Sequence, residues 1–81
     1  SLFLGSLDNL SEAINRNNAY INSITYQDNI VNIRITSPDV TSLDKVRRNI
    51  NQNSIFQATI LSTNQISNNI ESRLELRLRG S

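Results

Sequence analysis

The sequence predicts an α+β fold in which two helices cover one face of a four-stranded antiparallel sheet, as a two-layer sandwich. An amphipathic helical stretch followed by two strand-like stretches occurs twice along the 81 residues, giving the order αββαββ. The final stretch, residues 70–79, alternates apolar and polar or charged side chains. Such a period of two is typical of a strand with one buried and one solvated face.

The first helical stretch is indicated by four apolar residues at i, i+4, i+7 and i+11, which form one stripe on a helix. They are Phe3, Leu7, Leu10 and Ile14. The pair Asn17-Asn18 follows, and we expect it to end the helix, because Asn tolerates the left-handed conformation of a helix C-cap.

Residues 20–26 and 30–36 predict a β-hairpin, since both are rich in β-branched and aromatic residues and a polar turn, Gln27-Asp28-Asn29, joins them. In the second strand the apolar face consists of Val31, Ile33 and Ile35. In the first strand, plain alternation places Ile21 on the polar side with Ser23 and Thr25, and places Tyr20, Ile24 and Tyr26 on the other side.

The second half repeats this order. Ser37-Pro38-Asp39 ends the second strand, because Pro cannot continue a ladder. Asp39 is then a candidate N-cap of the second helix, with Thr41 and Ser42 as competitors. The apolar stripe of that helix consists of Val40, Leu43, Val46 and Ile50. We expect the third strand over residues 55–62 and a polar loop over residues 63–69.

Two αββ units commonly form a circularly permuted ferredoxin-like sandwich, an analogy at the level of the fold. That arrangement implies the sheet order third–fourth–second–first, with the first and third strands at the edges. On the sheet face without helices, Arg34 of the second strand is expected near Glu75 or Arg73 of the fourth.

The composition argues against an enzyme. The chain has no Cys and no His, and its acidic residues are scattered over turns, a helix cap and a surface strand. The carboxylates have no His or Cys partner for acid–base catalysis, the Ser and Thr residues have no base to activate them, and no clustered acidic loop supports a metal site made of carboxylates alone. We therefore expect no catalytic, cofactor-binding or metal-binding residues. The net charge of +1 gives no strong field toward nucleic acid or lipid, and no apolar run is long enough for a membrane span.

The candidate contacts with a protein partner are seven residues: Tyr20, Ile21, Arg34, Ile55, Arg73, Glu75 and Arg77. Tyrosine is enriched at interfaces. Ile21 and Ile55 fall on the polar sides of predicted edge strands, where apolar residues favour a partner. The arginines also allow an alternative, nucleic-acid binding on the sheet, but the central strands lack exposed aromatics for base stacking.

Three segments resemble a known family. They are Ile24-Thr25-Tyr26-Gln27-Asp28 followed by Ile33-Arg34-Ile35, Ser37-Pro38-Asp39-Val40 followed by Leu43-Asp44-Lys45-Val46-Arg47, and the closing strand from Ile70 to Leu78. Together they resemble the C-terminal periplasmic domain of the general secretion pathway L protein (the GspL/EpsL family) of type II secretion systems.

The resemblance implies a non-enzymatic assembly module on the periplasmic face of the bacterial inner membrane. It implies homodimers and heterodimers with the related M protein, and membrane anchoring through a helix outside this chain. The M protein and the type IV pilus N and O proteins carry similar modules and stay open as alternatives. We expect residues 1–81 to be a single excised domain, because the chain has no Met, and Gly80-Ser81 to be a candidate cloning remnant.

Overall fold

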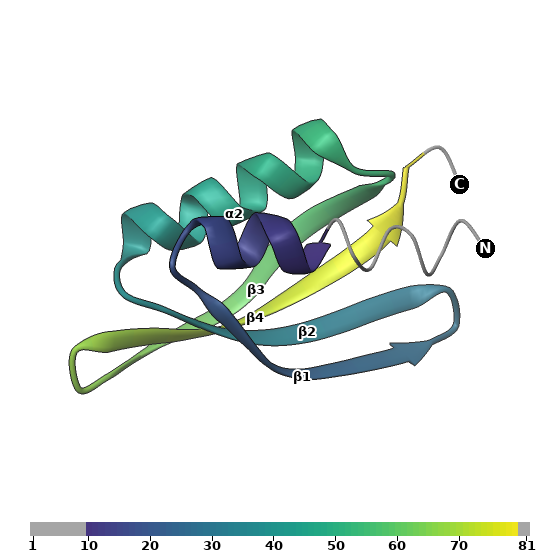
Figure 1. The fold of residues 1–81 in the computed structure, drawn as a ribbon. Coiled ribbons are helices and arrows are strands. Elements are labelled where there is room, and N and C mark those ends of the chain that lie inside the picture. Colours follow the sequence, from purple (N-terminus) through teal and green to yellow (C-terminus); the bar gives the residue numbers. More distant parts are fainter. Residues whose placement is uncertain (1–9, 80–81) are drawn as a thin grey trace.

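The computed structural model describes residues 10–79 and confirms the α+β sandwich (Figure 1). Two helices lie on one face of a four-stranded antiparallel sheet with the order β1-β2-β4-β3, which is the predicted order. The elements are a helix over residues 10–16, β1 (Tyr20–Gln27), β2 (Ile30–Ser37), α2 (Val40–Asn53), β3 (Phe56–Ile66) and β4 (Asn69–Leu78). The circular permutation stays a prediction.

The N-terminal helix ends as its sequence predicts. Asn18 has a φ of 61°, and the Ala19 N–H donates to the Ile14 carbonyl at 3.1 Å while the Asn18 N–H donates to the Asn15 carbonyl at 3.1 Å. This pair of bonds is a Schellman motif, which satisfies the last carbonyls of the helix. Leu10 and Ile14 are buried as expected, whereas Phe3 and Leu7 lie outside the described residues.

The core lies between the two helices and the two central strands. Every element except β1 contributes fully buried residues to it, and β1 contributes the partly buried Ile21. The central strands supply Val31, Ile33, Ile35, Ile70, Leu74 and Leu76, the helices supply Leu10, Ile14, Leu43, Val46 and Ile50, and Ala19, Phe56 and Ala58 complete the set. Val40, expected in the stripe of α2, is instead 65% exposed, because it opens the first turn of the helix at the rim of the core.

A two-residue turn, Asp28-Asn29, joins β1 to β2. Both residues have positive φ, 56° and 64°, which is the pattern of a type I′ turn that matches the twist of a hairpin. The Tyr26 hydroxyl donates to Asn29 Oδ1 at 3.0 Å across the turn. The predicted hairpin and its turn are confirmed.

The side assignment along β1 was wrong at its beginning. The register shifts between Ile21 and Ser23, so Asn22 is an extra residue, a β-bulge. Ile21 is paired with Ile35 and packs against the core on the helix side, while Tyr20 is paired with Thr36 on the opposite face. A bulge inverts the alternation for the residues before it, which explains both corrections.

The end of the sheet also differs from the prediction. The expected loop over residues 63–69 is strand: β3 continues to Ile66, and only Ser67-Asn68 form the turn to β4. Residues 61–69 are all exposed, and Figure 1 shows this end of the hairpin extending past the helices. Because neither face is covered there, the sequence needs no apolar alternation and looks like a loop.

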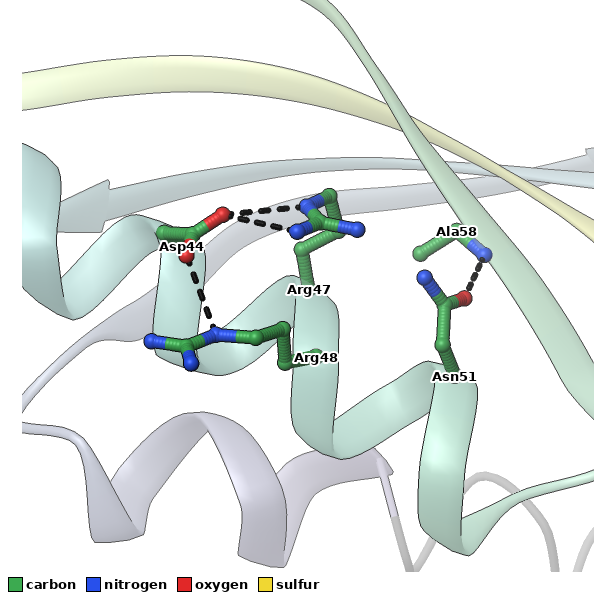
Figure 2. A network of polar contacts seen from close by, with 5 residues as sticks. All are labelled: Asp44, Arg47, Arg48, Asn51 and Ala58. Carbon is green, nitrogen blue, oxygen red and sulfur yellow. Dashed lines mark hydrogen bonds and ion pairs between the residues drawn. The ribbon is translucent and has the colours of Figure 1, made fainter.

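Helix α2 is fixed at both ends. Asp39 is the N-cap, and its carboxylate accepts a hydrogen bond from the Ser42 N–H at 2.7 Å. Near the other end, the Ala58 N–H donates to Asn51 Oδ1 at 2.6 Å and thereby ties the helix to β3 (Figure 2). The Arg79 guanidinium donates to the Asn51 carbonyl and links the same turn to the end of β4.

Replacing Asp39 with Ala is expected to lower the Tm by a few degrees near neutral pH, because the first turn of α2 loses its cap. The hydrogen bonds from the Ser42 N–H and hydroxyl lower the pKa of Asp39 below its usual 3.8. A carboxyl with a lowered folded-state pKa stabilises fully above the unfolded-state pKa, and this contribution is lost as the pH falls through the folded-state value. Thermal unfolding across that range should show the difference in Tm between the two proteins shrinking at acid pH. A difference that is constant with pH would contradict the assigned cap.

Candidate protein-protein interface

The face of the sheet opposite the helices, here called the open face, carries polar and charged side chains from all four strands. Directly paired residues of an antiparallel sheet share a face, so the registers define rows across it. The central row runs from Ser23 on β1 through Arg34 on β2 and Arg73 on β4 to Ser62 on β3. Two arginines therefore lie side by side on the two central strands.

Along β4 the open face alternates in sign. Its residues are Glu71, Arg73, Glu75 and Arg77. The Arg77 Nε donates to Glu75 Oε1 at 2.6 Å, and the Glu75 side chain is only 24% exposed. Glu75 was one of the two residues expected beside Arg34, but the two do not form a cross-strand ion pair. Glu75 is instead in register with Asn32, and its ion-pair partner is Arg77.

Arg34 and Arg73 have no ion-pair partner among residues 10–79. Like charges directly opposite each other in a sheet are destabilising. A hollow of about 340 Å³ lies beside the two arginines, and Ser23, Thr25 and Asn32 also line it. The site thus combines two guanidinium groups with hydroxyl and amide groups, which is a chemistry suited to a carboxylate.

A second hollow, of about 560 Å³, lies between the β1–β2 turn and the end of β4. Asp28, Glu75, Arg77 and Arg79 are the charged residues in its lining. The two carboxylates, Asp28 and Glu75, have no His or Cys beside them, because the chain contains neither residue. The described residues 10–79 also contain no group of three acidic, His or Cys side chains able to hold a metal ion.

The helix surface differs from the open face, because Arg47 and Arg48 have an ion-pair partner on the same helix. Arg47 donates to Asp44 at 2.9 and 3.1 Å, and Arg48 Nε lies 3.0 Å from the same carboxylate (Figure 2). The hydrogen bonds from Arg47 lower the pKa of Asp44, opposed by partial desolvation. This cluster therefore stabilises the charged state of Asp44 and gives both arginines an ion-pair partner, which Arg34 and Arg73 of the open face lack among residues 10–79.

The two edge strands expose apolar side chains. On the β3 side these are Ile55, Leu61 and Ile66, which are 40%, 45% and 52% exposed. On β1, Ile24 and Tyr26 face the helix side but remain about half exposed. Sequence reasoning missed Leu61 and Ile66, because Leu61 is the bulge residue of β3 and Ile66 lay in the expected loop.

The structure brings most of the candidate contact residues together. Four of them, Arg34, Arg73, Glu75 and Arg77, share the centre of the open face, and Tyr20 lies on the same face at the beginning of β1. Ile21 does not join them, since it packs against the core. Ile55 lies just before β3 rather than within it, and its carbonyl accepts from the Arg79 N–H at 2.8 Å.

Comparison with solved structures identifies the architecture. The chain is similar to the periplasmic domain of XcpY, with a TM-score of 0.80 and 14% identity over 91% of this chain and 97% of that one. It is also similar to the periplasmic domain of EpsL from Vibrio parahaemolyticus, with a TM-score of 0.78 and 20% identity over 94% of this chain and 93% of that one. The chain has the fold of these periplasmic domains. The resemblance found in the sequence is thus confirmed at the level of the fold.

The likeness to XcpY and EpsL spans nearly the full length of all three chains, so it concerns the whole sandwich rather than one hairpin. No family model and no curated protein matches this sequence. Within residues 10–79, no helix is both long and apolar enough to cross a membrane.

Proposed function

We propose that this chain is a periplasmic module of the inner-membrane platform of a type II secretion system, of the general secretion pathway L type, and that it acts by binding other protein domains. The observation that carries the proposal is the match of the whole sandwich to the XcpY and EpsL periplasmic domains. The described residues support a binding role over catalysis, because they offer exposed strand edges and a charged sheet face instead of a catalytic constellation.

The proposed partners are a second copy of the chain and an M-type periplasmic domain of the same kind of system. Residues 1–81 form the module on the periplasmic side, and a membrane helix outside this chain anchors it. The M protein and the pilus N and O proteins remain alternatives, but both solved structures reported above favour the L type.

Sedimentation equilibrium tests the proposal. Over a wide concentration range, we expect reversible dimers of the chain alone and heterodimers after an M-type periplasmic domain is added. An unrelated ferredoxin-like domain of similar size serves as the control and should leave the distribution unchanged. A strict monomer that also ignores the M-type domain would overturn the proposed function.

Nucleic-acid binding has less support. The open face of β2 and β4 carries no aromatic side chain, and Glu71 and Glu75 interrupt the positive charge. Single-stranded nucleic acids are usually held by a continuous basic groove with stacking aromatics. Titration with a labelled oligonucleotide at low salt should therefore show no saturable binding, and salt-sensitive binding would favour this alternative instead.

A further inference from the structure

We propose that two copies of this chain associate through their open faces, with the two β4 strands antiparallel across a two-fold axis, so that Arg73 of each copy binds Glu75 of the other. This inference rests on the proposed self-association and names the surface that carries it.

The charge order along β4 is self-complementary. Reading Glu71, Arg73, Glu75 and Arg77 backwards inverts every sign. A two-fold axis that crosses the strands midway between Arg73 and Glu75 therefore places each acid of one copy opposite a base of the other. A two-fold axis parallel to the strands would instead place Arg73 of one copy opposite Arg73 of the other. The charge pattern therefore favours the antiparallel arrangement of the two β4 strands. Closed two-fold interfaces of this kind are the commonest in homo-oligomers.

The registers of the neighbouring strand agree with this arrangement. A two-fold axis perpendicular to the strands places β2 of one copy opposite β2 of the other. Arg34 is in register with Arg73, and Asn32 is in register with Glu75. Arg34 therefore lies opposite Asn32 of the second copy and next to its Glu75. Two guanidinium groups then converge on one carboxylate, which relieves the repulsion between Arg34 and Arg73 within each copy.

The acceptor is available for this contact. Arg77 donates to Oε1 of Glu75, while Oε2 accepts no hydrogen bond from the described part of the chain. The Glu75 side chain is already largely shielded from water at 24% exposure, so little further desolvation is needed. The hollow beside Arg34 and Arg73 offers room for the incoming carboxylate. Because sheets twist, two faces align well only near the axis, which is where these residues lie.

The test uses two single charge reversals, Arg73→Glu and Glu75→Arg. Each places like charges opposite each other twice in a homodimer, so each variant alone should self-associate at least about tenfold more weakly than the wild type. An equimolar mixture of the two variants restores every opposite-sign pair, because the Glu at position 73 of one then faces the Arg at position 75 of the other. Sedimentation equilibrium of the mixture should recover a dimer, and raising the salt concentration should weaken it.

The control variant is Lys45→Glu, which reverses one exposed charge on α2 and should leave dimerisation unchanged. Circular dichroism confirms that the variants remain folded. Wild-type dimers that persist in both single variants would overturn this inference alone and place the interface on the strand edges or the helices. A mixture that stays as weakly associated as its components would also overturn it. A monomeric wild type would overturn the proposed self-association together with it.

Discussion

Replacing Leu76 with Asp is expected to unfold the domain. Leu76 is completely buried on β4, between Val31 of β2 and Ala58 of β3. Loss of the leucine side chain alone typically costs about 2–5 kcal/mol, and a buried carboxylate without a partner adds a further penalty. A domain of this size has a stability near the low end of about 5–15 kcal/mol, so the sum exceeds what the fold has available. Far-UV circular dichroism and a thermal melt would show the loss of structure.

The matched control is Gln57→Asp, which introduces the same carboxylate on the open face of β3, directly opposite Arg77. That variant should melt close to the wild type, because its new charge is solvated and faces a base. If Leu76→Asp melted cooperatively at the wild-type temperature, the inward face of β4 would be assigned wrongly.

Replacing Phe56 with Ala is expected to reduce the free energy of unfolding by about 3–5 kcal/mol. Phe56 is 1% exposed and is the largest of the fully buried side chains. The backbone around it is held by several hydrogen bonds: its own N–H donates to Ser54 Oγ at 3.1 Å, and the neighbouring Ala58 N–H donates to Asn51. A site fixed in this way cannot collapse around the cavity, which places the cost in the upper part of the usual range.

Urea unfolding measures this effect as a lower midpoint with an unchanged slope. Phe56→Leu is the comparison, because it keeps most of the buried volume and should cost far less than the Ala variant. Equal stabilities of the Leu and Ala variants would mean that the beginning of β3 moves inward to fill the space.

The sequence predicted the features of the fold that depend on strong periodicity. The order of the strands and the buried faces of β2 and β4 followed from their apolar alternation, although Ser72 is a polar residue on the inward face of β4. The bulge at Asn22 appears in the sequence only as the three-residue spacing between Ile21 and Ile24, and plain alternation over so short a strand therefore placed Ile21 on the wrong face. The strand character of residues 63–66 was hidden for a different reason, since a strand exposed on both faces has no alternation to detect.

The same limits apply to the candidate interface. The period of two placed Arg73, Glu75 and Arg77 on one face correctly, and it placed Arg34 on the same side of the sheet. It could not choose between Arg73 and Glu75 as the neighbour of Arg34. That choice depends on the register of β2 against β4, and a shift by two residues satisfies the hydrophobic pattern equally well.

The strand order has a consequence for how the chain reaches this structure. The β1–β2 and β3–β4 hairpins each close on a two-residue turn, so each can form on the microsecond timescale of isolated hairpins. The pairing of β2 with β4 is different, because it joins segments on either side of α2 and requires the entropy of closing a long loop. We therefore expect the docking of one preformed hairpin against the other to limit the folding rate. The contact between Ile33 and Leu74 should already be formed in the transition state, because these residues pair across β2 and β4. The contacts at the tip of the β3–β4 hairpin should form independently of this docking step.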